Sequence, residues 1–444
     1  MGNPVRFRGV VVKVHRYVGL ALAFFLIIIA ATGSIIAFYD ELERAFNPHQ
    51  HIVTPQKQGW TVQDLLAIRD KLEAQDPHSH LYSFQFPQNP DESVFSRVVG
   101  AIDPKTGKEY TLDYDEVFAN PYTGERLGQR FFGDFSLKPE NLISQIYYLH
   151  YALVLPLTAG IWLTAMVALL WAVDCFAGFY LTLPQGKKQE RGKTKSFWSR
   201  WKPAWQIKRG TAANRVIYDT HRASSLWIWP LLLIFAVTGF ALNLGGPYAQ
   251  IVSKFSAYAH FQEMPPGPPL AKPLINPPID WFEALKLGQR YFAEQAKIEG
   301  FTVGKPAALE YRRDHGMYFF VTHTSRDLRD AGGSPTESNT SATAATIAID
   351  ARDGRFLGLQ LPTGQRTGNT VTSWINAMHI TAIWGLPWQI AVAVLGIVIV
   401  VVAVTGVLIW LRKRKSRQPR QRTTLPNNTQ DTEAIGDVGK PARV

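Results

Sequence analysis

Four apolar stretches of this 444-residue chain are long enough to cross a bilayer, and the polar segments between them are two long and one short. A helix needs roughly 20 consecutive apolar residues to span a hydrocarbon core of about 30 Å. The apolar runs lie near 17–39, 157–183, 223–244 and 386–411. The first run is too long for a signal peptide and lacks a small-residue cleavage site, so we predict that it is an uncleaved span.

Lysine and arginine residues gather on one side of the predicted spans. They precede the first span, fill the short segment between the second and third, and follow the fourth as RKRKSRQPRQR. Because loops rich in these residues stay in the cytoplasm, both termini are predicted to be cytoplasmic and the two long polar segments to lie on the other side of the membrane. The formal charge of +12 therefore indicates topology and attraction to membrane lipid, and it does not favour a nucleic-acid partner.

This topology predicts the order of the segments along the chain. We expect a cytoplasmic N-terminus (1–16), a first span (17–39), a first periplasmic lobe (40–148), a second span (149–183), a basic cytoplasmic loop (184–220), a third span (221–244), a second periplasmic lobe (245–378), a fourth span (379–411) and a disordered cytoplasmic tail (412–444).

The two halves of the chain resemble each other. Residues 14–33 and 220–239 both place His-Arg and Thr-Gly at the same spacing. Each long loop then contains an amphipathic helix pattern and a strand, glycine turn and strand pattern. The helix patterns are 61–75 and 278–296, and the turn patterns are 117–128 and 347–358. We therefore predict an integral membrane α-helical protein with four transmembrane helices in two parallel repeats, each with a periplasmic α+β lobe.

Four histidines lie near the ends of the predicted spans, in matched pairs. His15 and His221 are expected at the cytoplasmic ends, and His150 and His379 at the outer ends. Ionisable residues at membrane depth usually face the protein interior. Two neutral imidazoles at one depth suit axial ligation of one haem iron, without covalent attachment. We predict two such haem sites; interfacial histidines, or a proton or metal path, are the alternatives.

The sequence also limits other cofactors. The single cysteine, Cys175, excludes an intrachain disulfide, a cysteine-ligated zinc or iron–sulfur site, and covalent haem attachment through a Cys-x-x-Cys-His motif. No flavin or nicotinamide motif is present. Gly33 and Gly239 each follow a cytoplasmic-end histidine by 18 residues, about five helical turns, and are predicted to leave room for the outer macrocycle.

Several further residues have two interpretations at this stage. Arg16 and Arg222 could pair with haem propionates or with lipid phosphates. Asp174 could relay protons, contact a quinol or pair with a basic neighbour. The His-x-His pairs in the first long loop suit metal binding or polar turns. Three aromatic residues near the outer pair suit an interfacial belt. The histidines of the His-x-His pairs are His49, His51, His78 and His80, and the three aromatic residues are Trp374, Tyr147 and Tyr148.

The chain resembles the PepSY-associated transmembrane-helix family, whose iron-regulated members include ferric-siderophore reductases of the ferrioxamine type. The resemblance is carried by His15-Arg16-Tyr17 through Thr32-Gly33, by the His221-Arg222 span, and by GLPWQIAVAVLGIVIVVVAVTGVLIWLRKR, over roughly residues 10–412. It implies an oxidoreductase with two b-type haems that passes electrons across the bilayer to a periplasmic ferric siderophore and releases the iron. Since no flavin domain is visible, it also implies a separate cytoplasmic or quinol electron donor.

Two other functions compete with this one. The PepSY name is also associated with non-enzymatic membrane proteins that bind or modulate a peptidase or sense a ligand. A transporter for the intact chelate is disfavoured, because a substrate path needs polar groups at the middle of the membrane and the spans offer few.

Overall fold

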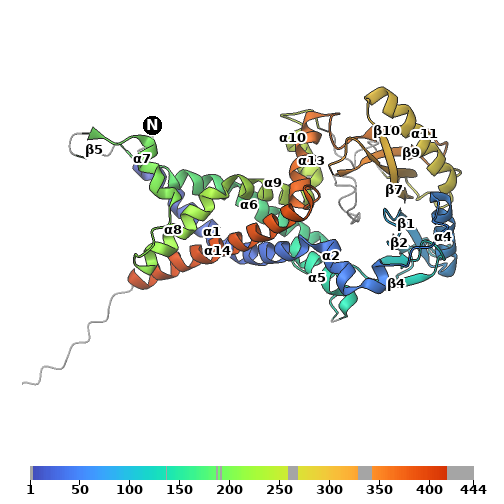
Figure 1. Cartoon of the computed structure of the whole chain (residues 1–444), viewed down its shortest axis with the longest axis horizontal. Helices are drawn as coiled ribbons and strands as arrows, with labels where there is room; N and C mark the ends of the chain where they lie inside the picture. The colour runs from blue at the N-terminus through green and yellow to red at the C-terminus, as the bar shows by residue number, and fades with distance from the viewer. Residues whose placement is uncertain are drawn as a thin grey trace, which may run out of the picture.

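A computed structural model describes residues 4–136, 138–186, 189–190, 193–258, 269–328 and 343–417. These residues form a helical bundle and a sheet domain, which lie at opposite ends of the long axis of the molecule (Figure 1). Four short helices connect the two parts. On one side of the junction these are α2 (Tyr39–Phe46) and α5 (Pro139–Ala152), and on the other side they are α10 (Gly245–Val252) and α13 (Thr367–His379).

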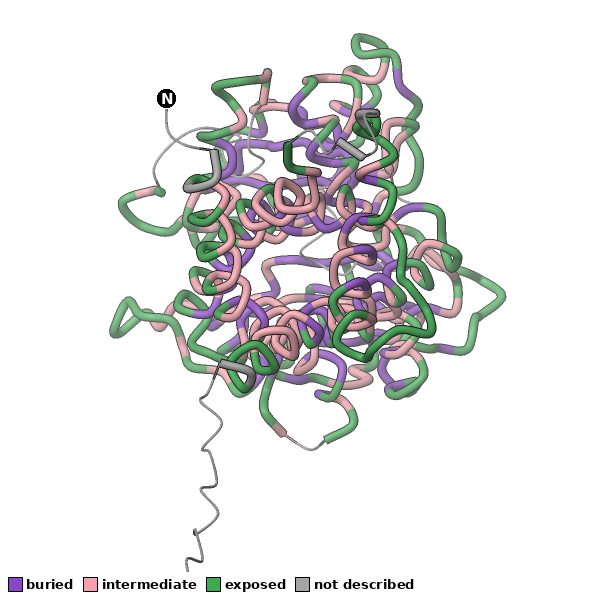
Figure 2. The backbone as a smooth tube through the Cα atoms, turned by 90° about the vertical axis from the view of Figure 1, so that its left-hand side faces the viewer, coloured by how far each residue is buried: buried purple, intermediate pink, exposed green. Residues whose placement is uncertain are grey.

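Among the described residues, three bundle helices are long and apolar enough to cross a membrane: α1 (Pro4–Ile36), α6 (Leu157–Thr182) and α14 (Gly385–Arg417). A bent pair, α8 (Ala213–Trp227) and α9 (Trp229–Asn243), provides a fourth crossing if the two helices count as one span. Only 17%, 39% and 33% of the apolar windows of the three long helices are buried, as helices in contact with lipid require (Figure 2). The chain is therefore a multi-pass membrane protein.

The predicted spans 149–183 and 379–411 are each interrupted, which corrects the expectation of continuous helices. The first contains the end of α5, then Leu153 and Val154 in the left-handed backbone region, then α6. The second contains the end of α13, then left-handed Thr381 and Trp384, then α14. A left-handed residue cannot continue a right-handed helix. Hydropathy did not reveal these breaks because the residues that make them are mostly apolar.

The third predicted span, 221–244, is bent by 70° between α8 and α9. Pro230 lies at the start of α9, where its missing N–H group costs the least. At the ends of the chain, α1 already begins within the predicted N-terminal segment 1–16, and α14 continues into the predicted disordered tail as far as Arg417. Residues 418–444 of that tail lie outside the described residues.

The described long strands form one antiparallel sheet with the order β10-β9-β8-β7-β1-β2-β3-β4. The helices α4 (Val62–Gln75) and α11 (Trp281–Glu299) pack against it over a core that includes Leu65, Phe292 and Phe320. The strands are β1 (Ser79–Gln85), β2 (Val94–Gly100), β3 (Glu116–Ala119), β4 (Arg126–Arg130), β7 (Val303–Arg312), β8 (Met317–Thr324), β9 (Ala345–Asp350) and β10 (Phe356–Gln360).

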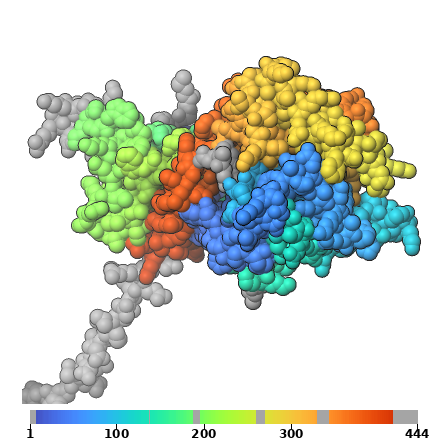
Figure 3. Space-filling view, turned by 45° about the vertical axis from the view of Figure 1, so that its right-hand side comes forward, coloured from blue at the N-terminus to red at the C-terminus, as the bar shows by residue number. Residues whose placement is uncertain are grey.

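The two predicted lobes share this sheet rather than forming separate units. Strand β1 of the first lobe pairs with β7 of the second, with Phe84 opposite Leu309, and the two lobes present one continuous surface (Figure 3). Pairing satisfies two edges that would otherwise expose unpaired N–H and C=O groups. Both predicted amphipathic helices are present as α4 and α11. The predicted hairpins are confirmed as β3–β4 and β9–β10, with Gly124 and Gly354 at positive φ.

A smaller set of elements lies at the opposite end of the bundle from the sheet domain. It comprises α7 (Phe197–Trp201), a 3₁₀ helix (Lys202–Trp205) and a two-stranded ribbon of β5 (Gln189–Glu190) and β6 (Lys193–Thr194). These residues belong to the predicted basic loop 184–220. The four-residue helix α3 (Pro48–His51) follows α2 at the junction.

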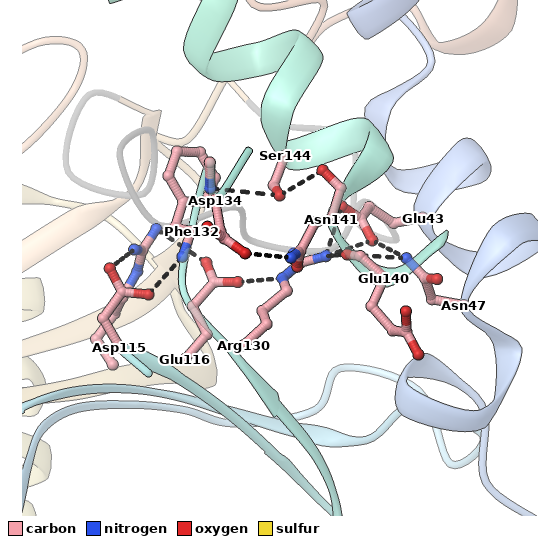
Figure 4. A network of polar contacts seen from close by, with 12 residues as sticks. Glu43, Asn47, Asp115, Glu116, Arg130, Phe132, Asp134, Glu140, Asn141 and Ser144 are labelled. Carbon is pink, nitrogen blue, oxygen red and sulfur yellow. Dashed lines mark hydrogen bonds and ion pairs between the residues drawn. The ribbon is translucent and has the colours of Figure 1, made fainter. Parts of the chain in front are cut away.

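A buried ion cluster fixes α2 against the sheet (Figure 4). Arg130 lies 3.0 Å from Glu43 of α2 and 2.5 Å from Glu116 of β3, and none of the three side chains is more than 3% exposed. Burial opposes the charge on Glu43, but the hydrogen bond with His51 and the charge of Arg130 together lower the pKa of Glu43 to about 2. The cluster therefore joins the end of the first span to the sheet domain.

We expect Arg130→Ala to destabilise the sheet domain by about 3–5 kcal/mol, because it leaves the buried Glu43 without an arginine partner and leaves Glu116 with Arg97 alone. Since the pKa of Glu43 is lowered in the folded state, its contribution is present above its ordinary pKa of 4.5 and is lost as the pH falls towards 2. Thermal unfolding in detergent micelles, followed by circular dichroism at neutral pH, measures the difference. The matched control is Arg290→Ala, whose partner Glu294 is 3.7 Å away and exposed; it should change stability by less than about 1 kcal/mol. Equal effects of the two variants would contradict the buried-cluster account.

Candidate functional site

The structure brings the four candidate histidines together in two pairs. The rings of His15 on α1 and His221 on α8 have centroids 6.3 Å apart. The rings of His150 on α5 and His379 on α13 have centroids 6.4 Å apart. All four side chains are half-buried. We refer to His15 and His221 as the tail-side pair, and to His150 and His379, next to the sheet domain, as the sheet-side pair.

In three of the four rings, Nδ1 meets a neutral oxygen on a neighbouring helix. Nδ1 of His150 lies 2.9 Å from the carbonyl oxygen of Ile29 and 3.2 Å from the Thr32 hydroxyl. Nδ1 of His379 lies 2.6 Å from the Thr238 hydroxyl. For His221, the carbonyl oxygen of Val402 is 2.9 Å away and the Thr405 hydroxyl is 3.4 Å away. The fourth ring, His15, meets a carboxylate instead.

These contacts determine which ring nitrogen carries the proton. The three threonine hydroxyls each donate to a carbonyl oxygen one turn earlier on their own helix, to Ile28, Ile234 and Val401. A hydroxyl that has donated its proton can only accept, and a carbonyl oxygen always accepts. The carbonyl partners therefore place the imidazole proton of His150 and His221 on Nδ1, so that Nε2 keeps its lone pair, and the Thr238 hydroxyl can accept from Nδ1 of His379 in the same way. Among the described residues, no hydrogen bond involves Nε2 of any of the four rings.

Glycines on the neighbouring helices make room for three of the rings. A Cβ atom at Gly33 would lie 2.9 Å from Cε1 of His150, and one at Gly406 would lie 3.2 Å from Cε1 of His221. At Gly178 the same atom would lie 3.3 Å from Cε1 of His15. Gly33 was predicted to leave room for a macrocycle, whereas the structure shows that it leaves room for an imidazole ring.

Gly239 behaves differently from the other three glycines. Its nearest neighbour is Cβ of Ala168 at 3.3 Å, so it serves the packing of α9 on α6. The ring of His379 instead stacks on Phe235, with centroids 4.6 Å apart and planes 26° apart. The predicted equivalence of Gly33 and Gly239 is therefore wrong in its contacts, although both residues line the cavity described next.

A cavity of about 970 Å³ adjoins the sheet-side pair. His150 and His379 form part of its wall, and the aromatic rings of Trp171, Phe235 and Tyr147 form another part. The size is near the upper end for ligand pockets, which cover about 300–1,000 Å³ and are mostly apolar. The cavity continues to a polar rim at the sheet domain, where the residues are Asp40, Glu41, Arg44, Asn89, Asp91, Glu92 and Arg97.

The spacing of the rings fits a haem. A metal–imidazole bond is about 2.0–2.1 Å long and a ring nitrogen lies roughly 1.1 Å from its ring centre, so two imidazoles on opposite faces of one metal have centres about 6.3 Å apart. The observed separations are 6.3 and 6.4 Å. Within the described residues, no group of three or more His, Cys, Asp or Glu side chains could hold a bare metal ion. Two histidines per site suit a metal that a macrocycle already holds.

The remaining candidates from the sequence have other partners. Arg222 donates to Asp219 at 2.8 Å and to the carbonyl oxygen of Pro203 at 2.6 Å, which favours a structural role over either predicted contact. Asp174 lies 2.9 Å from Nδ1 of His15, so its basic neighbour is one of the candidate ligands. Tyr147 lines the cavity, in addition to any place in an interfacial belt.

The His-x-His pairs do not converge on a common site. Nε2 of His51 lies 3.3 Å from Glu43, and Nδ1 of His80 lies 2.8 Å from Glu73. His78 stacks on Tyr110 with ring centroids 4.1 Å apart. These three rings thus have separate local partners, and His49 is exposed, as expected for polar turns. The role of the threonines was missed at the level of sequence, although Thr-Gly recurs at Thr405-Gly406 and could have indicated it.

Comparison with known families gives one match. A family model described as PepSY-associated TM region matches residues 12–413, which include all four histidines and both parts of the fold. No curated protein matches the chain.

We expect Gly33→Leu to displace His150 from its place on α1, because a side chain there crowds a packed contact; with one haem at each histidine pair, the haem content per protein would fall by about half. The Soret absorbance per protein measures the loss. Gly9→Leu is the control on the same helix, since a Cβ at Gly9 meets nothing within 4 Å. Full haem content in Gly33→Leu would contradict the packing of His150 against Gly33. A loss of haem in Gly9→Leu would show that the effect is not local.

Proposed function

The chain belongs to the PepSY-associated transmembrane family, and from that premise and the two histidine pairs we propose that it is a di-haem b-type reductase of the bacterial inner membrane. It passes electrons across the bilayer to a periplasmic ferric siderophore, and the iron is released. The observation that carries this proposal is the geometry of the pairs: ring centres 6.3 and 6.4 Å apart, with Nδ1 of each ring held by another helix.

The histidines would hold one haem at each pair, His15 with His221 and His150 with His379. When bound, haem iron alternates between the ferric and ferrous states and so carries one electron at a time. The threonine hydroxyls and backbone carbonyls orient the rings and keep Nε2 unprotonated. Such outer partners fix ring orientation and raise the basicity of metal-bound histidines. The glycines at 33, 178 and 406 permit the close approach of the rings.

We also propose that the two halves of the chain are parallel repeats, with both termini in the cytoplasm. The sheet supports this, because each half contributes one helix and four strands in the same order outward from the β1–β7 junction. Each histidine pair also takes one residue from each half. The basic residues at the tail-side ends of the bundle support the orientation.

The cavity supports a docking place for the acceptor next to the sheet-side pair. It runs from His150 and His379 to the polar rim at the sheet domain, where Arg44 pairs with Asp91 at 2.6 Å. A ferric chelate bound at the rim would lie at the end of the largely apolar cavity that leads to His150 and His379. Reduction lowers the charge of the iron and so weakens its bonds to hard oxygen ligands, which allows release. A separate cytoplasmic or quinol donor supplies the tail-side pair.

The experiment that tests this function uses proteoliposomes with a reductant on one side and a ferric hydroxamate on the other. We expect the wild type to reduce the chelate and His379→Ala to lose more than about 100-fold of the rate, because even the outer partners of metal ligands are worth 10–100-fold. His49→Ala, at an exposed histidine outside the pairs, should keep the wild-type rate. A wild type that neither contains haem nor reduces the chelate would instead favour a non-enzymatic binding or sensing role.

A further inference from the structure

One of the four histidine contacts differs in charge from the others. At three of the four contacts, the helix that faces the histidine ring carries a threonine immediately followed by a glycine: Thr32-Gly33, Thr238-Gly239 and Thr405-Gly406. On α6 the corresponding residue before Gly178 is Ala177, whose side chain has no atom that accepts a hydrogen bond. The acceptor there is Asp174, one turn earlier, whose Oδ1 lies 2.9 Å from Nδ1 of His15.

The position of Asp174 repeats that of the neutral acceptors. It lies four residues before its glycine, as Ile29 does before Gly33 and as Val402 does before Gly406. In those two helices the residue at this position offers its backbone carbonyl oxygen to a histidine. On α6 the same place offers a carboxylate. The substitution of a charged for a neutral acceptor therefore occurs at one ring of the tail-side pair and at neither ring of the sheet-side pair.

The environment of Asp174 makes this charge effective. Its side chain is 10% exposed and lies within the span α6, beside Gly19 of α1. Among the described residues, His15 is its one ion-pair partner. A charge acts strongly on its neighbours where the surroundings have a low dielectric constant. At the sheet-side end, in contrast, Nδ1 of His150 meets the carbonyl oxygen of Ile29 and Nδ1 of His379 meets the Thr238 hydroxyl, and both of these acceptors are neutral.

We propose that Asp174, acting through His15, gives the tail-side site a lower reduction potential than the sheet-side site. The inference rests on the proposed function. A carboxylate that accepts the Nδ1 proton makes His15 a stronger electron donor through Nε2 than a hydroxyl or carbonyl can. The nearby negative charge also favours the iron state with the higher positive charge. The difference orders the two sites so that an electron moves downhill from the tail side towards the sheet domain.

The test is a spectroelectrochemical titration of the full-length protein purified from membranes, after its haem content has been counted. We expect the wild type to titrate in two steps. His379→Ala, which retains the tail-side pair, identifies the lower step as the tail-side site. Asp174→Asn should raise that lower step towards the upper one, while Asp174→Glu, which keeps the charge, should leave two separate steps.

A control variant separates charge from the loss of any hydrogen bond. Thr238→Val removes the neutral acceptor of His379 and should move the upper step alone, by less than Asp174→Asn moves the lower step. Unchanged steps in Asp174→Asn at full haem content would overturn the inference and leave the proposed function intact. Loss of the tail-side haem in Asp174→Asn would also overturn it, because Asp174 would then hold the ligand rather than set its potential. Absence of haem from the wild type would refute the proposed function itself.

Discussion

An imidazole ring packed against a neighbouring helix needs a hydrogen-bond partner for its Nδ1, and this requirement organises the histidine sites of the bundle. An unpaired polar group in an apolar interior is destabilising by about 1–3 kcal/mol. In each pair the protein provides a partner for Nδ1 from a helix other than the one that carries the ring. Nε2 of each ring remains available to bind a ligand that lies between the two rings of its pair. The glycines and threonines around the histidines are consequences of this one requirement.

The breaks in the helices follow from the same requirement. A straight helix from the sheet domain into the membrane would continue past the depth of Gly33, whereas α5 and α13 stop at Ala152 and His379. Left-handed residues after each stop cost of order 1–3 kcal/mol unless other contacts hold them. Such contacts exist: the indole of Trp388 donates to the carbonyl oxygen of Met378, and the Tyr148 hydroxyl donates to that of Leu155. The breaks are thus fixed features that deliver the sheet-side histidines.

The pairing of the histidines and the two hairpins could be predicted from the sequence, because both depend on local pattern and spacing. The sequence did not show the junction of β1 with β7, since nothing in the run SHLYSFQ says which strand will lie beside it. The sequence placed Gly33 on the correct helix face, but the space beside it was predicted for a haem macrocycle, whereas the imidazole ring of His150 occupies it. It also left Asp174 with three roles, because a carboxylate on an apolar helix does not reveal its partner until the helices are packed.

The most direct test of the account is the haem content of the wild-type protein purified from membranes. A pyridine haemochrome assay should give about two b-type haems per chain, and the oxidised spectrum should be that of low-spin iron with two histidine ligands. Protein that is folded, as judged by circular dichroism, and yet contains no haem would contradict the account. The four Nε2 atoms would then need partners other than iron.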